Sequence, residues 1–438
     1  MGFHVAAPQD PEARETPERD ATTSGALARA TLPRVGLEAP PLAEAPAAGG
    51  DPSVAVSAPV QGAPAPLLGT MASTPLSSVA ESDVLLHDFE ELFAAEPDDE
   101  GGDLGGFMKD WLLLPIVLYA PETQVIIALT GAAFFNFEDR AVNRPSSIRA
   151  LGLVSTMGQL QINVEDELWI DRNRWRVANA FEYRDWPAVF YGLGNFTLVE
   201  NQESFSYRRV SVRTEIDYRV WRHLYVGLRH DFATYELTKT EPDGVLTQGT
   251  IPGADGGPTS GVGWNVSWDD RDSAMYATRG AYLSVSGLLY QGWLGSRYDF
   301  GTLSVDLRKF FVPWLDHVVA IQLRGDFTVG DVPFLYMPGL GGSKLLRGHF
   351  RDRYRDYNVL AAQAEYRMPL FWRFKAVLYS GVAQVAPHFR YFNLEHLRYG
   401  VGAGLRFALS ETNPAHMRID VGYAESSFRF YLQVFESF

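Results

Sequence analysis

From residue 112 onward, apolar and polar side chains alternate along the chain in one segment after another. Val319, Ile321 and Leu323, for example, alternate with Gln322 and Arg324. A repeat of two residues is that of a β-strand with one apolar and one polar face. Helical spacing is nowhere sustained in this region. The pattern therefore predicts an all-β fold.

Turn residues divide the region into sixteen segments, each long enough to cross a bilayer as a tilted strand. We expect strands at 112–120, 123–135, 147–156, 160–170, 174–184, 206–220, 223–238, 259–270, 279–290, 297–309, 317–329, 357–368, 372–384, 398–409, 415–424 and 428–436. The sequence contains no uncharged apolar run of about 18 residues or more, the length of a transmembrane helix. If the chain crosses a membrane, it must do so as a closed barrel.

The width of such a barrel decides which face of each strand points inward. Sixteen strands enclose a lumen too wide for side chains to fill, so an inward apolar face would stay wet. We therefore expect the apolar faces to contact lipid, and Arg324 and Glu365 to face the lumen. The connections alternate between short turns and longer loops, as in bacterial outer-membrane barrels. The predicted fold is a 16-stranded antiparallel transmembrane β-barrel in the bacterial outer membrane.

The chain ends in an alternating segment, 428–438, in which Phe430, Leu432 and Val434 share one face and the last residue is Phe438. The last strand of an outer-membrane barrel closes the cylinder and removes the sheet edge. We predict that these four residues form the C-terminal assembly signal through which barrel-assembly machinery inserts the chain.

The N-terminal region has a different composition. Residues 1–105 contain 13 of the 26 prolines and only three of the 57 aromatic residues, and residues 1–110 hold 19 acidic against five basic residues. Such a segment cannot bury enough apolar surface to offset its ordering entropy. We expect a disordered acidic arm over 1–105 and a barrel domain over 106–438. Met1–Asp20 lacks the pattern of a secretory signal peptide, which an outer-membrane protein needs. Either the start codon is misplaced, the signal lies upstream, or the inferred localisation is wrong, and we expect one of the first two.

Several kinds of chemistry are excluded or disfavoured by composition and motifs. The chain has no cysteine, so thiol, disulfide and zinc–cysteine chemistry are excluded. The barrel region has no excess of basic residues for nucleic acid. His230 and Asp231 lack a nucleophile elbow, and Asp269–Asp272 is more typical of a capped strand end than of a cation site. We expect no catalytic residues, cofactor or metal.

Three motifs together resemble the BamA/TamA family of outer-membrane proteins, also called bacterial surface antigens. The first is an acidic-arginine turn containing Asp269, Arg271, Asp272 and Gly280. The second is the segment 340–349, Leu-Gly-Gly-Ser-Lys-Leu-Leu-Arg-Gly-His, which is similar to an Arg-Gly element in a long loop of the family. The third is the C-terminal strand ending at Phe438.

The resemblance implies that the loop between the eleventh and twelfth strands folds back into the barrel. Its Arg347, followed by Gly348, would then pair with an acidic residue on the twelfth strand, for which Glu365 is the candidate. A planar guanidinium binds a carboxylate with two parallel hydrogen bonds. The acid that the family often has on the thirteenth strand is replaced here by Ser380, and the motif's aromatic residue by His349.

The resemblance also implies insertion or translocation of proteins at the outer membrane. The implied partners are outer-membrane lipid and unfolded outer-membrane or secreted polypeptides. Assembly proteins of this family carry folded periplasmic repeats before the barrel, and residues 1–105 contain nothing similar. Fold and function therefore have to be argued separately. A passive pore or a structural surface antigen without a protein client is the alternative.

Overall fold

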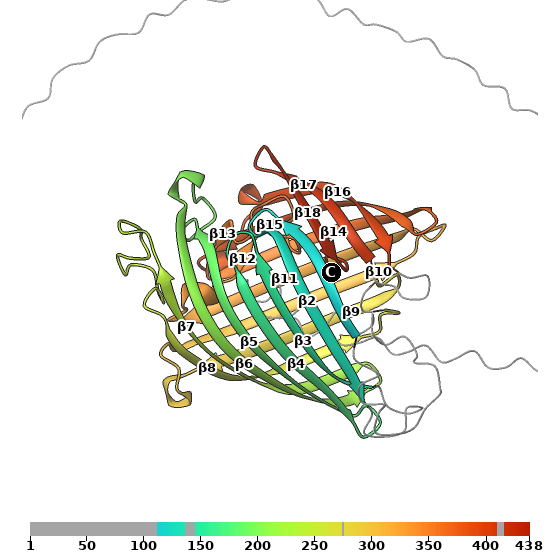
Figure 1. Ribbon diagram of the computed structural model, residues 1–438, viewed down its shortest axis with the longest axis horizontal. Coiled ribbons are helices and arrows are strands. Elements are labelled where there is room, and N and C mark those ends of the chain that lie inside the picture. The colour runs from blue at the N-terminus through green and yellow to red at the C-terminus, as the bar shows by residue number, and fades with distance from the viewer. Residues whose placement is uncertain (1–111, 136–144, 274–275, 410–415) are drawn as a thin grey trace, which may run out of the picture. The chain divides into compact units, whose positions relative to one another are not determined.

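The computed structural model describes residues 112–135, 145–273, 276–409 and 416–438. Sixteen antiparallel strands form a closed barrel in which β1 lies between β2 and β18 (Figure 1). The barrel strands are β1 Leu112–Ala120, β2 Gln124–Phe135, β3 Ser146–Ser155, β4 Leu160–Ile170, β5 Trp175–Phe190, β6 Glu203–Trp221, β7 Leu224–Lys239, β8 Gly257–Asp269, β9 Gly280–Tyr290, β10 Phe300–Phe311, β11 Val318–Gly330, β14 Asn358–Phe371, β15 Phe374–Ala386, β16 Arg398–Ala408, β17 His416–Ala424 and β18 Ser427–Val434. The predicted sixteen-stranded barrel is confirmed.

The largest error in the predicted strands is at the loop between β5 and β6. We expected β5 to end at residue 184, but it continues to Phe190 and pairs with β6 as far as Glu203. Pro187 lies in the part that was missed, and proline normally interrupts a ladder because it has no backbone N–H. The arm predicted over 1–105 lies outside the described residues. Among the helices of the described part, none is long and apolar enough to cross a membrane.

The two faces of the wall have the predicted orientation. Leu323 is 48% exposed on the outside, whereas Glu365 is 1% exposed inside the barrel. Buried charges on the inner face are paired, either within one strand at a spacing of two residues or across neighbouring strands. Arg176 of β5, for example, is 2.7 Å from Asp217 and 3.3 Å from Glu215, both on β6. Such pairing is needed because a buried charge without a partner is strongly destabilising.

At one rim, the connections are short turns except those after β2 and β8. At the other rim, the connections after β5, β7, β9, β11 and β15 are long, and those after β1, β3 and β17 are short. We call these the short-turn rim and the long-loop rim. The remaining elements are in the longer loops: η2 Val199–Asn201, η3 Gly292–Leu294, η4 Phe334–Tyr336, β12 Gly339–Leu340, β13 Tyr354–Arg355, η5 Phe389–Tyr391 and η6 Leu394–His396. Because β12 and β13 pair only with each other, the twelfth barrel strand is β14 and the thirteenth is β15.

The loop between β11 and β14 contributes much of the barrel's buried apolar cluster. Phe334, Leu335 and Tyr336 of η4 are buried in that cluster, which includes Phe205 of β6 and Phe300 of β10. The ring of Phe334 lies 5.6 Å from that of Phe205, edge to face. This apolar packing fixes the base of the loop against the inner wall and so positions the tip that follows it.

Candidate loop-to-barrel lock

Arg347, near the tip of this loop, is enclosed by three barrel strands. Its Nη1 donates to Asp420 Oδ2 of β17 over 2.8 Å, and its Nη2 donates to Glu365 Oε1 of β14. The guanidinium also lies 3.6 Å from the centre of the Tyr379 ring on β15. Burial alone would lower the pKa of Arg347, but Glu365 and Asp420 outweigh it and hold that pKa above its ordinary value. One side chain thus joins the loop to β14, β15 and β17.

The second acidic partner of Arg347 was not predicted from the sequence. The family often has this acid on the thirteenth strand, but here Ser380 lies there on the outer surface, and the neighbouring Tyr379 points inward. The missing carboxylate comes instead from Asp420, two strands farther along. A sequence signal for it does exist, because Arg418 and Asp420 alternate with Met417, Ile419 and Val421 and so share the luminal face.

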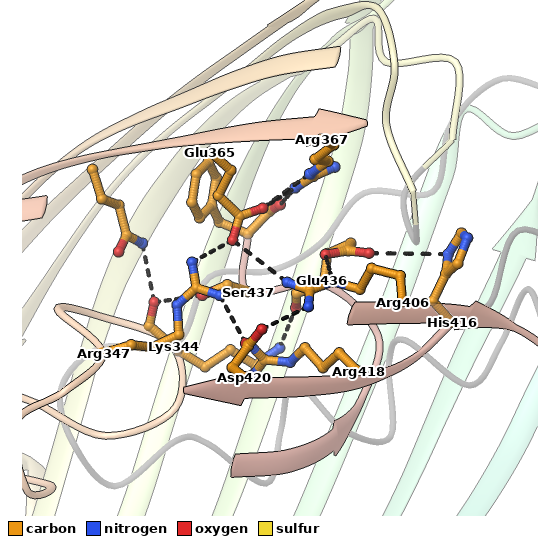
Figure 2. A network of polar contacts seen from close by, with 12 residues as sticks. Lys344, Arg347, Glu365, Arg367, Arg406, His416, Arg418, Asp420, Glu436 and Ser437 are labelled. Carbon is orange, nitrogen blue, oxygen red and sulfur yellow. Dashed lines mark hydrogen bonds and ion pairs between the residues drawn. The ribbon is translucent and has the colours of Figure 1, made fainter. Parts of the chain in front are cut away.

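Arg347 belongs to a larger network of buried ionic groups (Figure 2). Asp420 also accepts hydrogen bonds from Arg406 over 2.6 Å and from Arg418 over 2.9 Å. Glu365 also pairs with Arg367 over 2.8 Å. The carboxylates of Glu365, Asp420 and Glu436 pair with four arginines, Arg347, Arg367, Arg406 and Arg418, and Lys344 donates to the Glu436 backbone. Because basic groups outnumber acidic ones, each carboxylate compensates more than one buried cation.

Gly348 lets the loop approach the wall closely. Its φ of 109° is in the region that favours glycine, and a Cβ there would lie 3.0 to 3.1 Å from the backbone of Tyr423. The backbone N–H of Gly348 donates to the Tyr431 hydroxyl over 3.1 Å. On the wall side, a Cβ at Gly400 would be 2.5 Å from the Arg347 carbonyl oxygen, and one at Gly422 would be 2.7 Å from the Gly348 nitrogen. Gly400 and Gly422 thus leave space on β16 and β17 for the loop.

The end of the chain differs from the prediction. We expected a strand through residue 436, but β18 ends at Val434 and Phe435 has a φ of 65°. The last residues then run along the inside of the wall, where the Glu436 carboxylate pairs with Arg406 Nε over 2.8 Å. The tail also meets the loop, because Lys344 Nζ donates to the Glu436 carbonyl oxygen over 2.9 Å. These interactions with buried cations draw the tail out of the β-ladder.

The four predicted assembly-signal residues are therefore divided between two environments. Phe430 is exposed on the outer surface, Leu432 is half-buried, and Val434 is buried. Phe438 is buried on the inside, in a cluster with Ala277, Phe310 and Ala320. In the folded barrel, Phe438 is therefore not part of the closing strand.

The acidic-arginine turn connects β8 to β9 at the short-turn rim. Asp269 accepts hydrogen bonds from the backbone N–H, Nε and Nη2 of Arg271 over 3.1, 2.9 and 2.8 Å. Asp272 accepts from the backbone N–H groups of Thr278 and Arg279 over 2.9 and 3.2 Å. These carboxylates are used to hold the turn. In the described part of the chain, no group of three or more His, Asp or Glu side chains could hold a metal ion.

Gly280 ends the same turn with a φ of 101°, and a Cβ there would lie 2.4 Å from the Asp270 carbonyl oxygen. The turn is linked to the other two motifs through Arg367 of β14. Besides pairing with Glu365, Arg367 donates to the backbone oxygens of Phe438 over 3.1 Å and of Ala277 over 3.3 Å. Arg367 was not singled out from the sequence, although it shares the luminal face with Glu365 at a spacing of two residues.

His230 and Asp231 lie on opposite sides of the wall. His230 is exposed on the outside, whereas Asp231 is buried inside and accepts a hydrogen bond from the Tyr290 hydroxyl over 3.1 Å. Two groups separated by the sheet cannot act as a base and its orienting acid. His230 and Asp231 therefore do not form a catalytic pair.

Comparison with known proteins agrees with this architecture. The Omp85 superfamily domain matches residues 147–434. Among curated proteins, none matches the chain in sequence. The fold is similar to that of BamA from Haemophilus ducreyi lacking POTRA domains 1–3, with a TM-score of 0.53 and 13% identity over 73% of this chain and 69% of that one.

CdiB from Acinetobacter baumannii is also similar, with a TM-score of 0.48 and 11% identity over 74% of this chain and 59% of that one. At these identities the structural likenesses concern the fold alone, whereas the superfamily domain covers most of the chain. The chain therefore belongs to the Omp85 superfamily, as an outer-membrane barrel of the BamA/TamA type.

Proposed function

We propose that this protein inserts or translocates polypeptides at the outer membrane by opening between β1 and β18. The observation that carries the proposal is the weak pairing at this seam. Strand β1 pairs with β2 along its whole length, from Leu112 to Ala120, but pairs with β18 only between Tyr119 and Leu432. Since unmade backbone hydrogen bonds are costly in lipid, a nearly unpaired junction is where a client strand gains most by adding itself.

The contacts of Arg347 with Glu365, Tyr379 and Asp420, which we call the loop-to-barrel lock, determine where the barrel would open. By joining the loop to β14, β15 and β17, Arg347 stiffens the wall that leads to the seam from the C-terminal side. The Gln433 side chain, which donates to the Tyr119 carbonyl oxygen over 3.2 Å, is one of the few links across the seam itself. Opening would then be confined to the β1–β18 junction while the neighbouring strands stay in register.

A disulfide across the seam tests the proposal. The natural chain has no cysteine, so Tyr119→Cys with Leu432→Cys would introduce one defined pair at the observed register. Under oxidising conditions we expect client insertion or secretion to be lost, and a reductant to restore it. The matched control is Ala364→Cys with Ser380→Cys, partners in the fully paired β14–β15 ladder. Full activity of the oxidised seam variant would refute lateral opening.

Crosslinking distinguishes this function from a passive pore. Photoreactive residues at Leu113 of β1 and Phe430 of β18, which are both exposed near the seam, should form adducts with nascent outer-membrane or secreted polypeptides. The same purified barrel should show little steady conductance in a planar bilayer. Steady conductance without adducts would favour the pore.

We expect Arg347→Ala to release the loop at a moderate cost to the barrel. The variant loses two charged hydrogen bonds, but Glu365 keeps Arg367, and Asp420 keeps Arg406 and Arg418. Because neither carboxylate is left without an arginine, we expect the loss to be nearer that of one such hydrogen bond than of two, about 1.5 to 3 kcal/mol. Protease cleavage within 340–349 in folded barrels would report the release, and Arg347→Lys should restore only part of the protection. Unchanged protection in Arg347→Ala would contradict the proposed lock.

A further inference from the structure

The lipid-facing surface of the barrel carries a row of polar side chains across four neighbouring strands. Asp166 on β4 is opposite Asn179 on β5, Asn179 is opposite Thr214 on β6, and Thr214 is opposite His230 on β7. Asp166, Asn179 and Thr214 are half-buried, and His230 is exposed. The next residues on the same face are apolar on both sides of the row. Leu168 of β4 and Val177 of β5 are half-buried, and the others are exposed: Val164, Phe181, Val212, Ile216, Leu228 and Phe232.

The row lies inside the apolar belt of the wall. Trp175 and Tyr218, whose rings are 4.7 Å apart, belong to the aromatic residues at the short-turn rim. Asn179 and Thr214 are each four residues from them, which is about 13 Å along a strand. Since such belts are about 25 Å tall and their strands are tilted, this places the row near the middle of the membrane.

The hydrogen bonds within the row are directed toward Asp166. The Thr214 hydroxyl donates to Asn179 Oδ1 over 2.8 Å, and Asn179 Nδ2 donates to Asp166 Oδ2 over 3.0 Å. Donors aligned in this way stabilise a negative charge at the end of the chain. In the described part of the protein, the other carboxylate oxygen of Asp166 accepts no hydrogen bond. The row therefore favours a cation beside Asp166.

The same strands carry other outward charges, but only at the long-loop end. There Arg208 of β6 lies 3.0 Å from Glu236 of β7 and 3.4 Å from Asp185 of β5, and all three are near the end of the belt. Charges at that level can be solvated, whereas ionisable groups facing hydrocarbon are costly and mark functional contacts. Asp166 is therefore the group on this wall that most needs a partner.

We infer that the outer surface of β4–β7 docks a second membrane-spanning protein, which presents an arginine or lysine to Asp166 within the bilayer. A second copy of this chain fits poorly. With strands tilted by about 35–45°, the two ends of the row differ in depth by about 9 Å. A two-fold axis along the membrane normal would therefore not bring Asp166 level with His230 of the second copy. The docking surface excludes the β1–β18 seam, so this inference does not depend on lateral opening.

Photocrosslinking in intact outer membranes tests the inference. Photoreactive residues at Phe181 and Ile216 flank the row, and Leu323 and Leu378, equally exposed elsewhere on the barrel, serve as controls. We expect a discrete protein adduct from the first pair only, with the crosslinked peptide containing a basic residue in an apolar segment. Asp166→Asn should reduce the adduct at least tenfold in barrels that retain heat-modifiable mobility. The matched variant Asp185→Asn removes an outward charge at the rim and should leave the adduct unchanged.

Three outcomes would overturn the inference: an adduct of twice the chain mass, adducts with lipid only, or an adduct that persists in Asp166→Asn. A measurement without the partner separates docking from a structural role. In purified barrels in lipid alone, Asp166 and Asn179 face hydrocarbon without a partner. Asp166→Leu combined with Asn179→Leu should therefore raise the urea midpoint of unfolding. A lowered midpoint would assign the row to barrel stability and would refute docking.

Discussion

Replacing Asp420 with asparagine is expected to destabilise the barrel more than replacing any other single residue of the network. Asp420 is within 2.9 Å of three buried arginines, Arg347, Arg406 and Arg418. Without its charge, the network keeps all its basic groups and loses one of its three carboxylates. Breaking a buried pair in this way costs about 3 to 5 kcal/mol. Urea unfolding of refolded barrels, followed by heat-modifiable mobility on gels, measures the loss.

The control for this prediction is Asp326→Asn. Asp326 of β11 is also luminal, but its ionic partner is Arg324, whose side chain remains 17% exposed. Because Asp326 pairs with one arginine instead of three, the loss should be smaller, about 1.5 to 3 kcal/mol. Asp420→Glu, which keeps the charge, should recover much of the stability. If Asp420→Asn and Asp326→Asn were equally stable, the pairing of three arginines with Asp420 would not be what holds the loop in place.

Replacing Gly348 with alanine is expected to displace the tip of the loop from the wall. The added Cβ would meet the backbone of Tyr423 at 3.0 to 3.1 Å, tighter than ordinary contact, and backbone atoms in a ladder cannot move aside easily. The loop would have to retreat, which would lengthen the Arg347 contacts. We expect a loss of about 2 to 4 kcal/mol from overpacking and backbone strain together.

Gly194 provides a control that isolates the close approach. It has the same φ of 109°, but a Cβ there would meet no heavy atom within 4 Å. Gly194→Ala should therefore be destabilised by backbone strain alone, with a loss of about 1 to 2 kcal/mol in the free energy of unfolding. The difference between the two variants, in unfolding and in cleavage within 340–349, measures the contact with Tyr423. Equal effects would mean that the loop does not depend on that contact.

Much of the barrel could be predicted because its sequence pattern is local. Each strand shows a two-residue period on its own, and the free energy of moving each side chain into lipid or water decides which face points outward. Leu323 and Glu365 could therefore be placed without knowing their neighbours. The main error was the predicted end of β5. Proline usually interrupts a strand, but Pro187 is tolerated within the long β5–β6 hairpin.

The candidate site was less predictable because its contacts cross the lumen. Glu365 could be proposed from its strand number and inward face. The contribution of Asp420 could not, because it depends on how far the loop reaches toward β17 and on the space left at Gly400 and Gly422. The tail is a similar case, since alternation continues through 436 while the buried arginines draw Glu436 inward.

By itself, the sequence determined the number of strands, the outward and inward faces, and the position of the arginine-bearing loop. These follow from side-chain alternation and turn residues, which act over a few neighbours in the chain. Only the tertiary structure decided which acids meet Arg347, where Phe438 lies, and that Asp166, Asn179, Thr214 and His230 form one row. Those relations depend on strand register and barrel closure, which bring distant residues together and are not encoded in any single segment.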